Sequence, residues 1–401
     1  MSDTNIVLLG VGAIGRELLR QLATNYRTST RRIRVCGLVD RSGYAFESRG
    51  LSWRRVMELR ALKEAGTSIA QTEGGTACLP ETSVATLTAR LPRHSILVDA
   101  TAADTQPMLE AALHRGFDLV LANKLPLAGA QADFDRLNSI AEARGRRVAH
   151  EATVGAGLPV IDTLNKLIDA GDRVLSIEGC PSGTLGFLFG ELGQGRRFSD
   201  ALRAAIDAGY TEPDPRTDLS GIDVARKALI LARVIGFRGD FDDVAVESLV
   251  PSEFEKVSRD EFVARVGELD DLWARRVRAA AEQGCVLRYR AHVTKKSIAV
   301  GLARVPLGDS LATLSGTDNQ FIFTTSRYHA RPLVITGPGA GPAVTAAGVY
   351  NDVLSLAART PIRPTRSVSR RAGRASPAAR ERGRQRDLQH DVGSEPVLTA
   401  R

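Results

Sequence analysis

Long apolar runs are missing from this 401-residue sequence. No stretch approaches the roughly 18–20 consecutive apolar residues that a membrane-spanning helix requires, so we expect no membrane partner. Residues 1–5 are polar and an apolar strand pattern begins at Ile6, which leaves no room for a targeting segment. The sequence therefore predicts a cytoplasmic protein.

Cysteine and histidine are also scarce, with four and six residues respectively. No two cysteines form a CxxC pair, and no two histidines have the spacing of HxxxH or HExxH. A transition-metal site therefore has little support from the sequence. We expect buried, reduced thiols at Cys36, Cys78, Cys180 and Cys285.

Acidic and basic residues nearly balance except at the C-terminal end. Residues 361–401 contain ten arginines and four acidic residues, which gives +6 of the total net charge of +8. The rest of the chain carries only +2, so the charge does not indicate a nucleic-acid partner. Residues 361–401 also lack sustained apolar periodicity, which predicts a disordered basic tail.

Short apolar runs alternate with segments of helical spacing in the N-terminal part. This alternation predicts an α/β fold of the Rossmann type, a doubly wound parallel sheet with helices on both faces. The strand-like runs are residues 5–10, 34–40, 95–101, 117–122 and 147–150, and the helix-like segments include 17–23, 105–115 and 130–144.

The pattern changes after about residue 150 and predicts a second, α+β domain. Its amphipathic helices are expected at residues 158–170 and 222–235, and its strands at 286–293, 297–305, 319–325 and 333–336. The predicted domains are a dinucleotide-binding domain at 1–150 and a substrate-binding and dimerisation domain at 151–337. A last helix within residues 338–360 is expected to return to the first domain and complete it.

A G-x-G-x-x-G motif directly follows the first strand-like run and opens a helix. The first glycine permits a tight turn, the second lets the backbone approach a pyrophosphate, and the third allows close helix packing. The helix N-terminus attracts the anion. A simple turn or helix packing would explain the glycines alone, but this context indicates dinucleotide binding. The predicted cofactor contacts in the motif are Gly10, Gly12, Ala13, Ile14 and Gly15.

The second strand-like run ends at Asp40, which is followed by Arg41. An acidic residue there binds the ribose hydroxyls of NAD, whereas an arginine accommodates the 2′-phosphate of NADP. The pair leaves the choice of cofactor open, with a slight preference for NADP, and both residues could simply belong to a solvated loop.

The segment 209–233 (GYTEPDPRTDLSGIDVARKALILAR) combines a proline-stiffened acidic loop with a helix. Ser220 and Asp223 have the spacing of a capping box. Asp223 and Lys227 are four residues apart and share one helix face. A lysine held beside carboxylates keeps its proton and can donate it. The plainer alternative is a capped surface helix with an ordinary ion pair.

This segment resembles the signature of homoserine dehydrogenases. Further motifs carry the same resemblance, which covers roughly residues 5–358 and is closest to the dehydrogenase part of bacterial aspartokinase–homoserine dehydrogenases and to fungal stand-alone enzymes. These motifs are 122–124 (ANK), 151–161 (EATVGAGLPVI), 179–190 (GCPSGTLGFLFG) and 337–352 (GPGAGPAVTAAGVYND).

The resemblance implies reversible NAD(P)H-dependent reduction of aspartate 4-semialdehyde to homoserine, a step in threonine, methionine and isoleucine biosynthesis. It implies proton donation by Lys227, with Lys124 as a second candidate that also contacts the cofactor. The implied substrate contacts are Glu212, Asp218, Asp223 and Thr184. Further implied cofactor contacts are Thr101 and Gly341. A monovalent cation, usually sodium, is implied at the backbone of Glu151, Val154, Ala156 and Leu158.

The resemblance also implies a homodimer. Pro181 before Ser182 and Leu125-Pro126 after Lys124 depart from the family pattern without removing a matched functional group. The tail is too short and polar for a regulatory ACT domain, and no kinase region precedes the fold, so we expect no strong allosteric inhibition by threonine. The alternatives are another nicotinamide-dependent reductase of an amino acid, a phosphorylating semialdehyde dehydrogenase with Cys180 as nucleophile, and a non-catalytic dinucleotide sensor.

Overall fold

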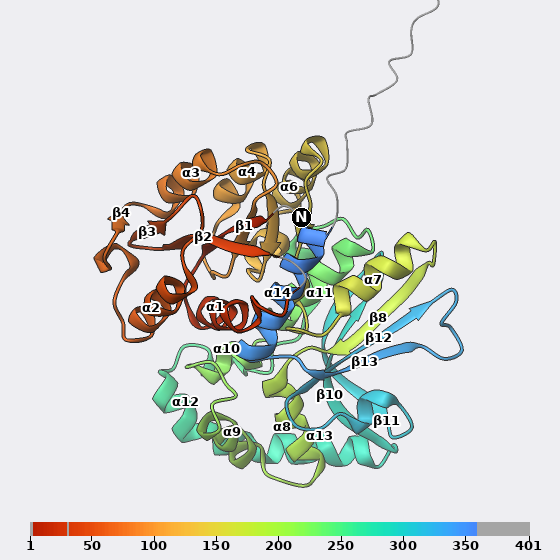
Figure 1. Cartoon of the computed structure of the whole chain (residues 1–401). Helices are drawn as coiled ribbons and strands as arrows, with labels where there is room; N and C mark the ends of the chain where they lie inside the picture. Colours follow the sequence, from red (N-terminus) through yellow and green to blue (C-terminus); the bar gives the residue numbers. More distant parts are fainter. Residues whose placement is uncertain (1–2, 30–31, 359–401) are drawn as a thin grey trace, which may run out of the picture. The chain divides into compact units, whose positions relative to one another are not determined.

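The computed structural model describes residues 3–29 and 32–358. The first sheet has the strand order β4-β3-β2-β1-β5-β6-β7 (Figure 1). Its strands are β1 (Thr4–Leu9), β2 (Ile33–Asp40), β3 (Gly43–Phe46), β4 (Gly75–Ala77), β5 (Ile96–Asp99), β6 (Asp118–Leu121) and β7 (Val148–Ala149). Strands β2, β1, β5, β6 and β7 are parallel, as the alternation predicted.

Helices cover both faces of this sheet. They are α1 (Ala13–Asn25), α2 (Trp53–Glu64), α3 (Pro80–Arg90), α4 (Gln106–His114), the short α5 (Leu125–Ala128) and α6 (Gln131–Arg144). Successive residues of a strand point to opposite faces. Ile6 and Leu8 accordingly join the core beneath α1 and α2, whereas Val7 and Leu9 join the core beneath α3, α4 and α6.

The parallel sheet is extended at one edge by two antiparallel strands that the sequence did not predict. Strands β3 and β4 are antiparallel to their neighbours. Both are short, and the turn into β3 depends on Gly43, whose φ is +151°. The apolar pattern missed them because such short strands bury few side chains and leave a weak signal.

The second sheet has the order β13-β12-β8-β10-β11-β9. Its strands are β8 (Val174–Cys180), β9 (Val244–Val246), β10 (Cys285–Val293), β11 (Ile298–Pro306), β12 (Asp318–Thr325) and β13 (Leu333–Pro338). Its helices are α7 (Val160–Asp169), α8 (Gly183–Gly193), α9 (Phe198–Asp207), α10 (Pro215–Leu219), α11 (Ile222–Val234), α12 (Arg259–Arg265) and α13 (Asp270–Ala281). Helices α8, α11 and α13 pack against β10. The predicted α+β character of this part is confirmed.

The last helix, α14 (Pro342–Ala358), packs against α1 and β6, two elements that lie much earlier in the sequence (Figure 1). Ala346, Val349 and Val353 share one buried core with Ile6 and Leu8. The predicted return of this helix to the first domain is therefore confirmed. The domain boundaries at 150/151 and 337/338 stay predictions, and the predicted tail at 361–401 lies outside the described residues.

None of the helices in residues 3–29 and 32–358 is long and apolar enough to cross a membrane. Of the four cysteines, all unpaired, Cys36 and Cys180 are buried, but Cys78 and Cys285 are only half-buried, contrary to the prediction. The exceptions lie beside β4 and at the start of β10, where the sheets meet solvent.

Candidate active site

The loop between β1 and α1 has the geometry that a dinucleotide requires. Gly10 has a φ of +94°, and a methyl group placed there would lie 2.8 Å from the carbonyl oxygen of Ala100. A methyl group at Gly15 would collide with the carbonyl oxygen of Gly10. Gly12, by contrast, faces open space, and helix α1 begins there without a side-chain cap. The free N-terminus, with Ala13 and Ile14 in its first turn, fits a pyrophosphate.

Asp40, at the end of β2, is already occupied by protein donors. Its carboxylate accepts hydrogen bonds from Lys63 Nζ (2.7 Å) and from the main-chain N–H groups of Ile69 (3.0 Å) and Ser42 (2.8 Å). Burial alone would raise the pKa of Asp40, but the bonds from Lys63 and Ser42 outweigh it and hold the pKa below its usual value. Arg41, the next residue, is exposed.

A buried carboxylate, that of Asp99, fixes the ends of β5 and β6. Asp99 accepts hydrogen bonds from the hydroxyls of Thr101 (2.7 Å) and Thr105 (2.6 Å) and from Asn123 Nδ2 (3.0 Å). Asn123 Oδ1 in turn accepts the main-chain N–H of Leu125 at 3.1 Å. This network sets the direction in which Lys124, between Asn123 and Leu125, leaves the backbone.

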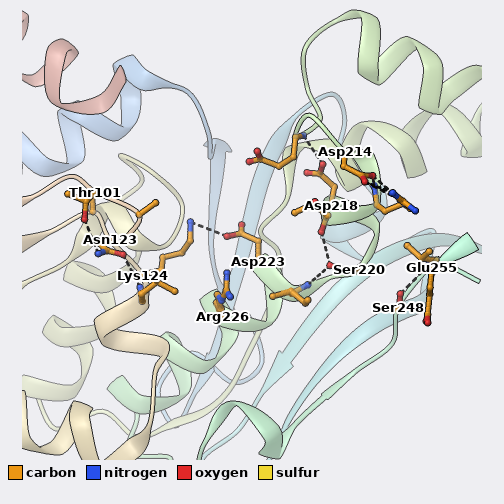
Figure 2. A pocket seen from close by; sticks show the side chains of 18 residues that line it. Thr101, Asn123, Lys124, Asp214, Asp218, Ser220, Asp223, Arg226, Ser248 and Glu255 are labelled. Carbon is orange, nitrogen blue, oxygen red and sulfur yellow. Dashed lines mark hydrogen bonds and ion pairs between the residues drawn. The ribbon is translucent and has the colours of Figure 1, made fainter. Parts of the chain in front are cut away.

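One carboxylate joins two lysines that come from different domains. Asp223, in the first turn of α11, lies 3.0 Å from Lys124 Nζ and 2.8 Å from Lys227 Nζ. Figure 2 shows Lys124 reaching Asp223 from the opposite side of the cavity. Burial opposes the charge of Asp223, but the two lysines hold its pKa far below the ordinary range. Lys227 also donates to the carbonyl of Pro181 at 2.7 Å.

A second acidic group lies beside this cluster. The Asp218 carboxyl contacts the Thr184 hydroxyl (2.9 Å) and accepts the main-chain N–H of Glu212 (2.8 Å). Thr184 also donates to the carbonyl of Tyr210 at 2.6 Å. Burial, together with the negative charges of Glu212 and Asp223, raises the pKa of Asp218. The Glu212 side chain is exposed and lines the cavity, where its carboxylate can bind a cation.

The predicted capping box at Ser220 and Asp223 was wrong. The N-cap of α11 is Gly221, whose φ is +74° and which makes no side-chain cap bond. A methyl group on Gly221 would collide with the hydroxyl of Tyr289. The helix therefore begins one residue later than the capping pattern requires, and Asp223 is left to pair with the lysines.

A cavity of about 930 Å³ is lined by many of these groups (Figure 2). Of the predicted site residues it contains Thr101, Lys124, Glu212, Asp218 and Asp223. Lys227 and Thr184 reach the site through Asp223 and Asp218. The wall also includes Asn123 of the 122–124 motif, Arg216 of the 209–233 segment, and three residues that the sequence did not single out: Ser248, Val250 and Glu255. Ser248, Val250 and Glu255 are on loops without a motif, so only the fold could place them there.

Gly341 lies outside this cavity, in the turn before α14, with a φ of +109°. Gln21 of α1 donates to the carbonyl of Ala343 at 2.8 Å, which holds this turn beside the helix that follows the glycine motif. Thr345 closes the turn by donating to the carbonyl of Gly341. The turn is thus brought to the helix that carries the predicted pyrophosphate site.

The segment from Glu151 to Leu158 forms a turn with two consecutive positive φ angles, +77° at Gly155 and +56° at Ala156. The Glu151 carboxylate caps α7, because it accepts the N–H groups of Ile161 and Asp162 at 2.7 Å each. Burial raises the pKa of Glu151 to about 7. Within residues 3–29 and 32–358, no cluster of three acidic, histidine or cysteine side chains could hold a metal ion. A cation in this turn would therefore depend on main-chain carbonyl oxygens, and Val154 and Ala156 are buried there.

The fold consists of a Rossmann-type sheet with its helices and a second α+β part, and the cavity is lined by residues of both. Residues 10–151 match the family model for the NAD binding domain of homoserine dehydrogenase, and residues 159–354 match the model for homoserine dehydrogenase. The chain belongs to the homoserine dehydrogenase family.

Individual relatives agree with this assignment. The chain is 38% identical over 372 residues to a homoserine dehydrogenase of Emericella nidulans, covering 88% of this chain and 98% of that one. It is 37% identical over 362 residues to a bifunctional aspartokinase/homoserine dehydrogenase of Zea mays, covering 87% of this chain but only 38% of the relative. A crystal structure of a Candida auris protein of unknown function has a TM-score of 0.81 and 32% identity, covering 90% of this chain and 99% of that one.

Proposed function

We propose that the protein is a homoserine dehydrogenase that interconverts L-homoserine and L-aspartate 4-semialdehyde with a nicotinamide cofactor. The observation that supports this most directly is the Lys124–Asp223–Lys227 cluster, which faces an acidic cavity at the carboxyl ends of β5 and β6. In open α/β sheets, ligands bind outside these strand ends. The cavity thus combines a place for a cofactor, a proton source and groups that bind an ammonium.

Lys227 is the proposed proton donor to the substrate oxygen during reduction, and it accepts the proton during oxidation. Its ammonium is held by Asp223 and by the carbonyl of Pro181, which together fix its position. Lys124, bound to the other oxygen of Asp223, is the second candidate for this role. When bound, the nicotinamide cofactor supplies or accepts the hydride.

The carboxylates orient the substrate. Glu212 and Asp223 attract the ammonium of the amino acid, and Asp218 with Thr184 supports this edge of the cavity. Holding the substrate in one orientation converts a collision into an intramolecular reaction, which contributes several kcal/mol to lowering the barrier.

NADP is the proposed cofactor. The Asp40 carboxylate, which would bind the ribose hydroxyls of NAD, is engaged by Lys63, Ile69 and Ser42. Arg41 is exposed beside it and can pair with a 2′-phosphate. Gly10, Gly12, Ala13, Ile14 and Gly15 would hold the pyrophosphate, and Thr101, Lys124 and Gly341 are the other proposed contacts.

A monovalent cation, sodium in this proposal, would bind to the main chain of Glu151, Val154, Ala156 and Leu158. The positive φ of Ala156 turns the backbone of this loop, and the Ala156 carbonyl oxygen comes close to Gly348 of α14, where an added methyl group would lie 2.5 Å away. The cation would thus stabilise the junction between the loop and α14.

A cytoplasmic homodimer is the proposed state of the protein. Strand β13 forms an edge of the second sheet, and Val334 on it is 40% exposed, which suits pairing with a second copy. A mass measurement in solution tests this, and a monomer at micromolar concentration would contradict it.

The phosphorylating dehydrogenase alternative is weakened by the environment of Cys180. This thiol is buried, and burial raises its pKa to about 12, so it does not supply the thiolate that such an enzyme requires. A non-catalytic sensor would not need two lysines on one cavity carboxylate.

A steady-state assay of homoserine oxidation with NADP and with NAD tests the proposed function. The expected result is homoserine-dependent reduction of both cofactors with a higher kcat/KM for NADP. Absence of homoserine-dependent reduction with either cofactor would contradict it, and turnover of a different amino alcohol alone would favour another reductase.

A further inference from the structure

A buried arginine connects the helix that carries Asp223 and Lys227 to the segment that carries Lys124. Arg233 lies in the last turn of α11 and is 5% exposed. Its guanidinium donates to the carbonyl oxygens of Leu127 (2.7 Å) and Gly129 (2.8 Å). Both acceptors are at the end of α5, the short helix that begins directly after Lys124.

The same guanidinium is held from two other sides. It donates to the carbonyl of Gly239, in the loop after α11, at 2.9 Å. It also lies over the ring of Phe134 of α6, 5.0 Å from the ring centroid. Arg233 therefore binds groups of both domains at one point.

Segment 123–129 is thereby fixed at both ends. At its start, Asn123 is bound to the buried Asp99 of β5. At its end, Leu127 and Gly129 are bound by Arg233. Lys124 lies between these anchors and reaches Asp223 at the other end of α11, ten residues or about 15 Å from Arg233 along a rigid helix. Helix α11 thus controls the position of Lys124 from both of its ends.

A contribution to the stability of the fold does not by itself explain why an arginine is buried at position 233. A buried cation loses its hydration, and an apolar side chain of similar volume is often as stabilising in such a place. The Arg233 partners named above are neutral carbonyl groups, and its Nε atom is buried without a hydrogen-bond partner in the described part of the chain. A planar, multi-donor group that joins several carbonyls instead provides fixed geometry.

We propose that Arg233 is a positioning residue, which sets the distance between Lys124 and the Asp223–Lys227 pair by holding the end of α5 against α11. The proposal rests on the proposed function, because it concerns the rate of that reaction. Arg233 acts through Lys124 and does not itself touch the substrate.

The test is a double-mutant cycle that combines Arg233→Lys with Lys124→Met. Lysine keeps the positive charge but cannot bind three carbonyls in a planar arrangement. Because misplacement by about 1 Å can cost about 100-fold in rate, we expect Arg233→Lys to lower kcat at least about 10-fold. The dissociation constant of NADPH, measured by its fluorescence in the absence of substrate, should change less than kcat, because Lys124 is the one proposed cofactor contact that is displaced and the glycine loop is untouched. In the Lys124→Met background, Arg233→Lys should have almost no further effect on kcat.

Arg288 provides the matched control. It is also 5% exposed, and it donates to the carbonyls of Leu311 (3.0 Å) and Ala312 (2.7 Å) in the second domain, away from the cavity. Arg288→Lys should lower the melting temperature as Arg233→Lys does, but leave kcat per folded enzyme within about two-fold. If Arg233→Lys does not fold, Phe134→Leu loosens the same guanidinium, and its smaller decrease in kcat should again vanish in the Lys124→Met background.

Three results would overturn the proposal. One is a kcat for Arg233→Lys within about two-fold of wild type. Another is the same factor with and without Lys124, which would make Arg233 a structural anchor only. The third is an equal loss of kcat in the Arg288→Lys control. If the proposed function itself were wrong, the wild-type protein would not oxidise homoserine, which distinguishes that outcome from a failure of the Arg233 proposal.

Discussion

The Lys227→Met substitution tests whether Lys227 is a catalytic proton donor or only a partner in a structural ion pair. Methionine keeps the length and the apolar stem but removes the transferable proton. Lys227 is 12% exposed at its side chain, and the substitution removes its bonds to Asp223 and to the carbonyl of Pro181. Asp223 keeps its pair with Lys124 at 3.0 Å, so its half-exposed carboxylate still has a cationic partner.

The substitution should lower both the stability of the fold and the catalytic rate, and the two effects can be measured separately. Loss of charge-assisted hydrogen bonds should lower the free energy of unfolding by about 1.5–3 kcal/mol, less any compensation from Lys124. General acid catalysis contributes about 10²–10⁴-fold, so kcat should fall at least about 100-fold, or about 2.7 kcal/mol in barrier. The fold and the NADPH affinity should persist.

The assay is steady-state homoserine oxidation together with a thermal melt and NADPH titration of the same preparations. Lys166→Met is the matched control, because Lys166 also pairs with an aspartate four residues away, Asp162, but on the exposed face of α7. Its kcat should equal that of wild type. A Lys227→Met enzyme that retains more than about a third of the wild-type kcat would refute the role, since general acid catalysis contributes far more. Lys124 would then be the better candidate.

Other predictions concern the substrate and the cofactor. Glu212→Gln weakens the attraction for the ammonium, so kcat/KM for homoserine should fall more than kcat, and an equal fall of both would contradict a binding role. The raised pKa of Asp218 means that it takes up a proton at higher pH than an ordinary aspartate. Acidification should therefore lower kcat/KM for homoserine sooner than an ordinary aspartate would, and Asp218→Asn should remove that dependence; a profile identical in the two proteins would contradict it. Arg41→Ala should raise KM for NADP more than KM for NAD, whereas equal effects would make Arg41 an ordinary loop residue.

The sequence was most informative where a motif or an apolar periodicity extends over a whole helix or strand. The parallel strands β1, β2, β5 and β6 follow from apolar runs that are buried on both faces, and α14 follows from an apolar run that is buried along one face. Short strands such as β3 left too few buried residues to be detected. The capping pattern at Ser220 failed because Gly221, packed against Tyr289, starts the helix with a positive φ, and this tertiary contact has no local signal.

The candidate site likewise contains some features that the sequence predicts and others that only the fold reveals. The acidic loop and the lysine four residues after Asp223 were readable from spacing. The pairing of Lys124 with Asp223 joins positions 99 residues apart and required the fold. The anchoring of Lys124 by Asp99 and Arg233 was likewise invisible, because the carbonyl acceptors of a guanidinium carry no side-chain signature.

The proposed reaction is tested most directly by following the hydride from NADPH into the product. The protein would be mixed with L-aspartate 4-semialdehyde and NADPH that carries deuterium at the transferable position, and the product would be analysed by mass spectrometry. If the proposed function is right, the product is L-homoserine with one deuterium at the carbon of the former aldehyde, formed at a rate that Lys227→Met lowers at least about 100-fold. Unlabelled product, another product, or no turnover by the wild-type protein would contradict it.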